Sequence, residues 1–306
     1  MKPGRASRTA QFAAGFRALE TARRPARDRL VEDPFAVHFL PASMRALVRV
    51  SALPALGGLV RANVERNWPG AMTSGVARTR LIDDWVRDAV RDGIDLIVIL
   101  GTGFDSRAYR LPELATMRVV EIDHPDTQAL KRAGIARLVG TPPANVAYLA
   151  ADLSSADLRD VLRASNLNLS RRAFVIWEGV THYLPAMSVE RTLREIATTC
   201  APGSRLVFTY IHRGLIDGTI AFDGANLSRD RVSGEGEPWI FGFDPASLAT
   251  DLAAYGLTLC EDHGADNYRA RYWGEAGRRM RGFSFYRAAL AEVPRERLTS
   301  PPGRPA

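Results

Sequence analysis

Residues 95–107 read DLIVILGTGFDSR, and this stretch decides the fold. A short apolar run such as LIVIL is typical of a strand that is buried on both faces of a sheet. Two glycines follow the run, Gly101 and Gly103, and they let the backbone approach a ligand closely where a strand turns into a helix. The stretch therefore predicts the first strand of a parallel α/β sheet, with a ligand-binding turn at its carboxyl end.

Further short apolar runs follow this strand, and they alternate with helical segments. They are Arg118–Asp123, Val146–Ala151, Ala173–Trp177, Ser204–Ile211, Leu257–Glu261 and Phe283–Ala288. Strands that alternate with helices are typical of a doubly wound, mostly parallel sheet. Together with residues 95–100, these runs predict an α/β fold with a seven-stranded sheet.

Before residue 93 the pattern is helical, because apolar residues recur from Ile82 to Val90 at the spacing of one helix face. We predict an N-terminal helical cap with a lead-in helix over residues 1–92 and the sheet domain over 93–293. The long, Gly-rich segment 213–243 interrupts the strand and helix rhythm, and we predict that it forms a lid. The Pro- and Arg-rich residues 294–306 are predicted to be a disordered tail.

Composition excludes several classes of protein. The chain of 306 residues is 46% hydrophobic and 25% charged, as is typical of a soluble globular protein. It lacks a run of ~18 apolar residues, the length that a membrane span needs, and we expect no membrane partner. Its two cysteines, Cys200 and Cys260, predict neither a disulfide framework nor a bound metal, and they favour the cytoplasm.

The net charge of +7 raises the question of a nucleic-acid partner. The arginines, however, are spread along the chain and interleaved with acids, as in Arg87-Asp88 and Arg91-Asp92. This pattern favours a solvated, Arg-rich surface. We therefore expect no nucleic-acid partner. We also expect the protein to be a monomer or a homodimer.

The turn after the first strand distinguishes between two cofactors. A dinucleotide-binding fingerprint has Gly or Ala at its sixth position, beside a pyrophosphate. Here that position is Ser106, and Asp105 precedes it. A carboxylate repels a pyrophosphate, whereas S-adenosylmethionine carries no phosphate and has a cationic amino group. The motif therefore favours S-adenosylmethionine, and a plain tight turn is the alternative.

Acidic residues also end the next two strands. Asp123 lies 22 residues beyond Gly101, a spacing at which a carboxylate accepts hydrogen bonds from both ribose hydroxyls. Asp152 ends the third strand and is suited to accept from the adenine amine, while the backbone of Leu153 donates to the ring. A helix N-cap is the alternative role for Asp152. Three acids at three consecutive strand ends favour a nucleoside site.

The fourth strand leads into WEGVTHYL, residues 177–184. Glu178 stands where the strand meets the predicted cleft, with a structural salt bridge as the alternative. His182 and Tyr183 follow it and are the candidate catalytic residues. For Tyr183 the alternative is core packing, and for His182 it is a polar surface histidine or a packed one.

These motifs carry a family resemblance. The runs ARTRLID (77–83), ILGTGFDSR (99–107), EIDHP (121–125), DL (152–153) and WEGVTHYL (177–184) resemble the leucine carboxyl methyltransferase superfamily, in particular its actinobacterial S-adenosylmethionine-dependent branch. The resemblance covers about residues 10–290 and implies the Rossmann-like fold of class I methyltransferases. The chain departs from the branch at Ser106, where Thr is usual, and at His182, which leaves the substrate open.

The resemblance also implies roles for individual residues. Arg78 would pair with the methionine carboxylate of the donor, Asp123 would take the ribose, and Asp152 with Leu153 would hold adenine. Glu178 would face the cationic amino end or line the cleft. A second basic contact to the donor carboxylate would come from the cap, where Arg17 and Arg27 are both candidates.

The sequence leaves the acceptor open. We expect O-methylation of a carboxylate or a hydroxyl on a small molecule or peptide. A carboxylate needs no base, whereas a hydroxyl would gain from one, and His182, His124 and His212 are candidates. Two alternatives are a nicotinamide-dependent oxidoreductase, which Asp105 disfavours, and a non-catalytic binding protein that retains the fold.

Overall fold

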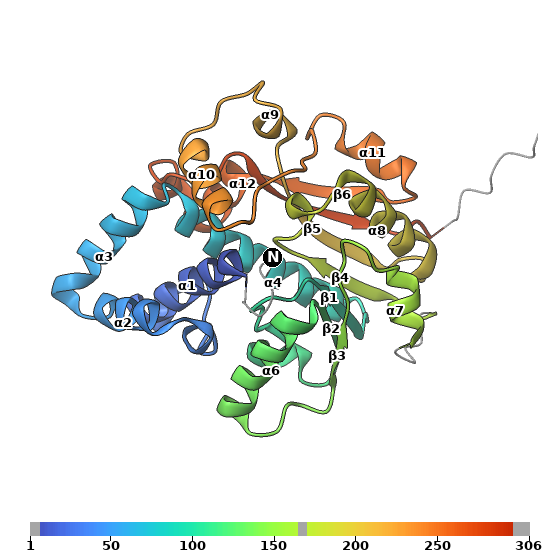
Figure 1. The fold of residues 1–306 in the computed structure, drawn as a ribbon, viewed down its shortest axis with the longest axis horizontal. Coiled ribbons are helices and arrows are strands. Elements are labelled where there is room, and N and C mark those ends of the chain that lie inside the picture. The colour runs from blue at the N-terminus through green and yellow to red at the C-terminus, as the bar shows by residue number, and fades with distance from the viewer. Residues whose placement is uncertain (1–6, 165–169, 296–306) are drawn as a thin grey trace, which may run out of the picture.

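One seven-stranded sheet forms the centre of the computed structural model, which describes residues 7–164 and 170–295 (Figure 1). The strands are β1 (Leu96–Leu100), β2 (Arg118–Asp123), β3 (Val146–Ala150), β4 (Ala173–Trp177), β5 (Arg205–Ile211), β6 (Thr258–His263) and β7 (Tyr286–Glu292). Their spatial order is β3-β2-β1-β4-β5-β7-β6, and β7 runs antiparallel to both of its neighbours. The predicted doubly wound, mostly parallel sheet is confirmed.

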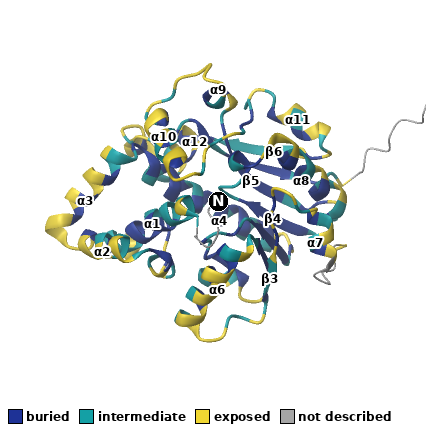
Figure 2. Ribbon diagram, in the orientation of Figure 1, coloured by how far each residue is buried: buried dark blue, intermediate teal, exposed yellow. Residues whose placement is uncertain are grey.

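Side chains alternate between the two faces of the sheet, so that each strand contributes to two cores. In β1, Leu96, Val98 and Leu100 pack toward α7 (Leu158–Ala164), α8 (Ala186–Thr199) and α11 (Leu248–Ala254). Ile97 and Ile99 of the same strand face α4 (Ala71–Arg91), α5 (Arg107–Arg110) and α12 (Ala265–Gly277). Figure 2 shows the result, a buried sheet between helices whose outer faces are exposed.

The cap consists of α1 (Arg8–Arg23), α2 (Ala42–Ser51) and α3 (Pro54–Asn67), with short 3-10 turns η1 (Ala26–Asp28) and η2 (Ala36–Phe39). These helices gather on one side of the sheet (Figure 1). Their apolar core includes Phe104 from the turn after β1 and Ile135 from α6 (Pro125–Val139). Phe39 stacks on Phe104 with ring centroids 5.0 Å apart. The cap therefore shares its core with the α/β domain.

The segment predicted as a lid leaves β5 through α9 (Arg213–Ile216) and α10 (Ala225–Gly234). It returns along an extended stretch that is tied to the sheet domain by two backbone hydrogen bonds. Ile240 N donates to His182 O at 2.8 Å, and Phe243 N donates to Ile211 O at 3.1 Å. No helix within residues 7–164 or 170–295 is both long and apolar enough to span a bilayer.

The last strand lies later in the chain than predicted. The sequence predicts residues 283–288, but β7 pairs with its neighbours over 286–292. Phe283 and Phe285 instead pack in a cluster with Ile211 and Leu215. The paired residues include buried alanines, which have a low strand propensity and gave no signal. Of the predicted tail 294–306, residues 296–306 lie outside the described part of the chain.

Candidate active site

A cavity of about 640 Å³ lies at the carboxyl ends of β1 to β4, between the sheet, α1 and the lid segment. This is the edge at which ligands bind in open α/β sheets, and the volume is in the range of small-molecule sites. All ten of the predicted site residues line it: Arg78, Gly101, Gly103, Asp105, Asp123, Asp152, Leu153, Glu178, His182 and Tyr183. The fold therefore brings every one of them into a single cavity.

The turn after β1 requires glycine. Gly101 has φ +61° and Gly103 has φ +49°, in the left-handed region that other residues rarely adopt. A Cβ atom on Gly101 would collide with the side chain of Val180, so a larger residue here requires Val180 to move. The turn thus exposes its backbone to the cavity, as a closely approaching ligand requires.

Asp123 ends β2 with its carboxylate already positioned by the backbone. It accepts hydrogen bonds from Gly103 N at 2.5 Å and from His124 N at 2.7 Å, one on each oxygen. Burial raises the pKa of Asp123, and the two N–H groups oppose that shift. Because each oxygen has two lone pairs, both can still accept from a ligand.

Asp152 and Leu153 follow β3. Leu153 is buried, whereas Asp152 is exposed and accepts hydrogen bonds from Ser154 N at 2.9 Å and Ser154 Oγ at 2.7 Å. Asp152 therefore closes a turn and does not cap α7, which begins at Leu158. Both residues line the cavity.

Glu178, at the end of β4, lies between two arginines. Its Oε1 accepts from Arg78 Nε at 2.8 Å, and its Oε2 accepts from Arg107 Nη1 at 2.8 Å. Burial alone would raise the pKa of Glu178, but Arg107 and Arg78 outweigh burial and lower it. The structure thus supports both interpretations of Glu178, a salt bridge and a cleft residue.

Arg107 is the centre of a buried ion network. Its side chain is 2% exposed, and besides Glu178 it binds Asp105 and Asp83, with Arg107 Nε 2.7 Å from Asp83 Oδ1. Burial opposes the charge on Asp105, but Arg107, together with Lys131 and Arg17, outweighs burial and holds the pKa of Asp105 below its usual range. The carboxylate that distinguishes this turn from a dinucleotide fingerprint is therefore ionised and held in place.

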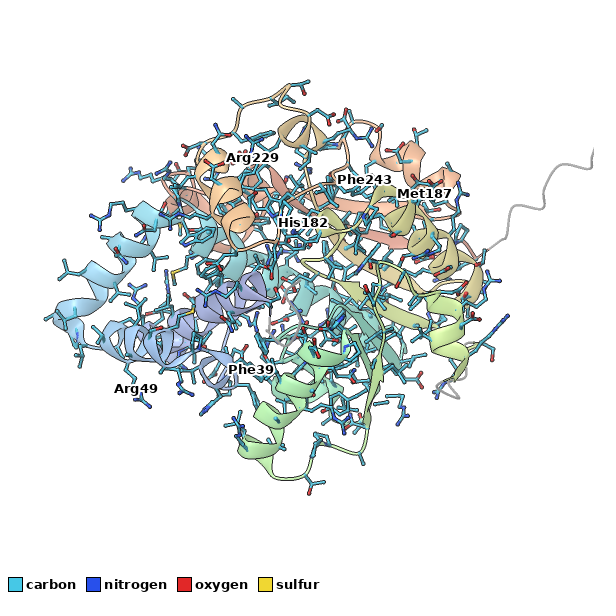
Figure 3. The ribbon with its side chains drawn as sticks, in the orientation of Figure 1. Phe39, Arg49, His182, Met187, Arg229 and Phe243 are labelled. Atoms are coloured by element: carbon cyan, nitrogen blue, oxygen red, sulfur yellow. The ribbon has the colours of Figure 1, made fainter. Side chains whose placement is uncertain are left out.

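His182 and Tyr183 belong to the short turn η4 (Thr181–Tyr183). His182 lies in the interior, as Figure 3 shows, and its ring packs against Tyr183 at 4.2 Å and Tyr286 at 5.3 Å between centroids. Its Nδ1 atom is buried and has no hydrogen-bond partner among the described residues. Burial, with a smaller contribution from Arg78, lowers the pKa of His182 to about 3. Burial raises the pKa of Tyr183, because it disfavours the charged phenolate.

The structure distinguishes between residues that the sequence left as alternatives. Arg17 lines the cavity, with its Nε 2.7 Å from Asp33 and its Nη2 donating to Phe104 O at 2.6 Å. Arg27 does not line it, because its side chain is 86% exposed and pairs with its neighbour Asp28. Of the other two histidines, His124 lines the cavity and His212 does not. His212 instead caps α9 by accepting from Gly214 N at 3.0 Å.

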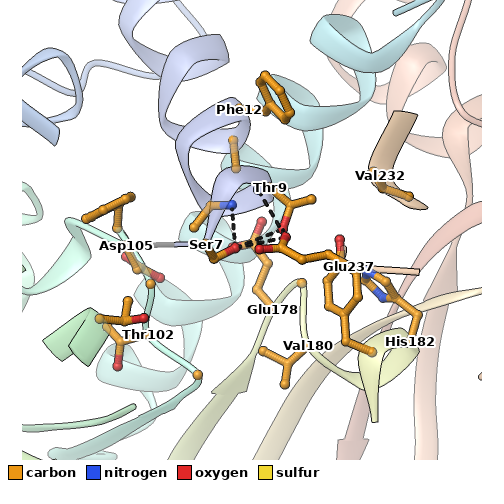
Figure 4. Close-up of a pocket in the computed structure, with 18 of the residues that line it drawn as sticks. Ser7, Thr9, Phe12, Thr102, Asp105, Glu178, Val180, His182, Val232 and Glu237 are labelled. Carbon is orange, nitrogen blue, oxygen red and sulfur yellow. Dashed lines mark hydrogen bonds between the residues drawn. The ribbon is translucent and has the colours of Figure 1, made fainter. Parts of the chain in front are cut away.

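One contact within the cavity lining was not predicted from the sequence (Figure 4). Glu237, in the lid segment, accepts hydrogen bonds from Thr9 Oγ1 at 2.5 Å, Ser7 Oγ at 3.1 Å and Thr9 N at 3.2 Å. Its other oxygen accepts from Arg8 N at 3.1 Å. We call these contacts the Glu237 clasp. They join the first turn of α1 to a loop more than 200 residues away, and no local pattern in the sequence signals them.

The chain is also similar to proteins of a known family. The model of the leucine carboxyl methyltransferase family matches residues 10–197. A Mycobacterium avium protein named "putative S-adenosyl-L-methionine-dependent methyltransferase" is 35% identical over 243 residues, which cover 76% of this chain and 71% of the relative. A Mycobacterium marinum protein of the same name is 31% identical over 257 residues, covering 81% and 77%.

Two solved structures have a similar fold. One is a "putative methyltransferase" from Thermobifida fusca, with a TM-score of 0.59 and 19% identity, covering 96% of this chain and 97% of the other. The second is a DUF574 family protein from Streptomyces avermitilis, with a TM-score of 0.58 and 14% identity, covering 91% and 97%. At these identities the likeness concerns the fold alone.

Proposed function

Since the chain belongs to the leucine carboxyl methyltransferase family and is an S-adenosylmethionine-dependent methyltransferase, we propose that it methylates a carboxylate oxygen of its acceptor. The observation that carries the proposal is the state of His182. With a pKa of about 3, this histidine is neutral at physiological pH and is a weak base. An acceptor that is already ionised needs no base, and a carboxylate fulfils that condition.

The residues of the cavity fit the methyl donor. Gly101 lines the cavity and has no side chain to extend into it, Asp123 would take the ribose hydroxyls, and Asp152 with Leu153 would hold the adenine. Glu178 lies where it would face the cationic amino group. Among described residues, the Nη atoms of Arg78 form no hydrogen bond, and we propose that they bind the donor carboxylate together with Arg17.

Methyl transfer to a carboxylate depends on the alignment of donor and acceptor more than on acid or base catalysis. When bound, S-adenosylmethionine supplies a methyl group on a cationic sulfur. An acceptor oxygen in line with that group forms the O–C bond as the S–C bond breaks, its own lone pair makes the bond, and no proton moves. The protein's contribution is to hold the two reactants in register and to exclude water, which the cap and the lid segment favour.

The test of this proposal is the stability of the product to base. Methyl esters release methanol in mild alkali, whereas methyl ethers and methylamines do not. We expect the radioactivity transferred from a labelled donor to be released as volatile methanol. A base-stable product would overturn the carboxylate assignment and leave a hydroxyl or an amine as the acceptor. For a hydroxyl, His182 or His124 would be the candidate base.

We further propose that the protein acts in the cytoplasm on a small molecule, as a monomer or a homodimer. Both cysteines, buried Cys200 and exposed Cys260, are free thiols, which supports a reducing compartment. Sedimentation of the purified chain would measure its oligomeric state directly.

A further inference from the structure

We propose that the acceptor is a small aromatic carboxylic acid, with its ring system bound in the half of the cavity that lies under the cap and the lid. The inference rests on the proposed function for the carboxylate and adds the chemical class of the acceptor's body. It follows from the distribution of rings, charges and openings around the cavity.

The cavity has two chemically different halves. The donor half contains the glycine turn and the acids at the strand ends. The other half is lined by rings from four separate parts of the chain, and we call it the aromatic half. Its ring residues are Phe12, Phe16, Trp68, Trp239, Phe283 and Tyr286. With Phe104 and Tyr183, eight of the chain's 25 aromatic residues line this one cavity, a concentration that core packing alone does not require.

The rings contact one another in pairs around the cavity. Phe12 and Trp68 meet at 4.9 Å in a tilted pair on the side of the cap. Trp239 packs against Phe285 at 5.5 Å, and Tyr286 meets His182 edge to face. Small residues of the helices, Ala13 on α1 and Ala71 and Gly75 on α4, also line the cavity and keep it open. An aromatic lining of this kind favours a flat ring, because rings gain from stacked and edge-to-face contacts.

Most of the charged residues that line the cavity lie in the donor half. In the aromatic half the charged lining residue is Glu237, whose carboxylate is already occupied by the Glu237 clasp. The cations that line the cavity, Arg17 and Arg78, lie toward the donor half, and the Arg78 guanidinium lies 4.5 Å from the Tyr286 ring centroid. An acceptor that fits has an uncharged, apolar body and one anionic end that reaches the junction.

The opening favours a small molecule over a polypeptide. The Glu237 clasp joins the first turn of α1 to the lid segment, so that two parts of the cavity lining are connected to each other (Figure 4). A peptide terminus would need this connection to open while it extends into solvent, whereas a small acid can be enclosed. Enclosure also excludes water from the transfer.

The experiment measures binding of three probes to the complex with S-adenosylhomocysteine: 2-naphthoate, decanoate and a hexapeptide ending in leucine. Titration calorimetry and quenching of tryptophan fluorescence are the readouts, and methyl ester formation is scored separately. We expect 2-naphthoate to bind at least ~10-fold more tightly than the other two probes, because its ring system can make stacked and edge-to-face contacts with the aromatic side chains. Tighter binding of decanoate or of the peptide would overturn the inference.

Variants locate the site. Phe12→Leu and Trp239→Leu should each weaken 2-naphthoate binding about tenfold and leave the affinity for S-adenosylhomocysteine unchanged, since neither ring lines the donor half. Tyr255→Leu is the matched control, because Tyr255 packs at the end of α11 against Arg194 and does not line the cavity. Unchanged binding of 2-naphthoate in both Phe12→Leu and Trp239→Leu would place the ring elsewhere and refute the proposal.

Failure of this inference and failure of the proposed function are distinguishable. If S-adenosylhomocysteine itself does not bind, the donor site is wrong. If S-adenosylhomocysteine binds and 2-naphthol is methylated while 2-naphthoate is not, an aromatic acceptor is supported. The proposal that a carboxylate is methylated is then refuted. If S-adenosylhomocysteine binds and decanoate alone becomes an ester, methylation of a carboxylate is supported. The proposal that the acceptor is aromatic is then refuted.

Discussion

Arg107 Nη1 lies 2.8 Å from Glu178 Oε2, and this contact ties the turn after β1 to the end of β4. The same guanidinium binds Asp83 on α4, so one side chain connects three elements below the donor half. Arg78 reaches the other oxygen of Glu178 from α4. Glu178 is thus oriented before any ligand binds, and one of the two residues that orient it, Arg107, does not itself line the cavity.

Arg107→Ala should destabilise the protein by about 3–5 kcal/mol, because it leaves the carboxylates of Asp83, Asp105 and Glu178 buried near one fewer cation. Urea denaturation monitored by circular dichroism measures this change. Arg91→Ala is the control: the Arg91 side chain is 73% exposed, and its ion pair with Asp88 should contribute about 0–1 kcal/mol. Equal losses in the two variants would contradict a central role for Arg107.

Asp123→Ala should weaken binding of S-adenosylhomocysteine by about 2–4 kcal/mol, since it removes a charged acceptor and leaves the ribose hydroxyls without partners. Asp123→Asn should cost less than the alanine change but not be neutral. The asparagine amide must point one N–H group at a backbone N–H, either that of Gly103 or that of His124.

Titration calorimetry measures both Asp123 variants, with exposed Asp88→Ala as the control for a lost surface charge. If the alanine variant kept native affinity, the ribose would have to bind elsewhere. Loss of the fold is separable, because an unfolded variant would also lose its circular dichroism.

Arg78→Lys should weaken donor binding, because a single ammonium group cannot replace the parallel hydrogen bonds of a guanidinium. A donor analogue that lacks the carboxylate isolates this effect. It should bind the native protein and the Arg78→Lys variant with affinities within about threefold of each other, or roughly 0.7 kcal/mol. A large difference that persists with the analogue would instead assign Arg78 to holding Glu178, which it contacts at 2.8 Å.

Glu237→Gln should loosen the first turn of α1, because the neutral amide keeps the shape of the side chain but weakens four hydrogen bonds. We expect amide exchange near Thr9 to accelerate about tenfold, equivalent to ~1.4 kcal/mol of local stability. Glu235→Gln is the control, since Glu235 makes one exposed pair with Arg8. Protection that is equal in the two variants would show that the Glu237 clasp does not hold the cap.

The sequence predicted the donor half because its signals are local. Gly101, Asp123 and Glu178 each stand at the end of a strand whose apolar run is readable, and parallel strands bring those ends to one edge. The aromatic half was not predicted. Its rings come from α1, the end of α3, the lid and the residues around the start of β7, and no periodicity relates them.

The contacts that each side chain makes were also harder to predict than its place in the fold. The sequence left Glu178 as either a salt bridge or a cleft residue, and the structure makes it both. Arg17 and Arg27 could not be distinguished by spacing, because the difference between them is burial against Phe104 rather than helical phase. The last strand was predicted at 283–288 and lies at 286–292, because the buried alanines in its second half have a low strand propensity.

His182→Asn should retain most of the methylation rate, within about tenfold of the native protein, because a carboxylate acceptor leaves the imidazole without a proton to take. The native pH profile should show no limb from His182 between about pH 5 and pH 9, since burial lowers its pKa to about 3 from an ordinary value of 6.5. The same shift predicts a stability effect with a definite sign. A histidine whose pKa is lowered on folding stabilises the native state above pH 6.5, and that stability is lost as the pH falls toward 3, because the unfolded chain takes up the proton first.

The stability of the native protein should therefore fall relative to His182→Asn by about 1.4 kcal/mol for each pH unit between roughly pH 6 and pH 4. Urea denaturation of both proteins at several pH values measures the difference, and the exposed variant Asp88→Ala controls for general acid effects. A constant difference would mean that His182 titrates normally and is available as a base. Together with a loss of rate of about 10²-fold or more in the His182→Asn variant, that result would overturn the proposal of a carboxylate acceptor. The acceptor group would then be a hydroxyl.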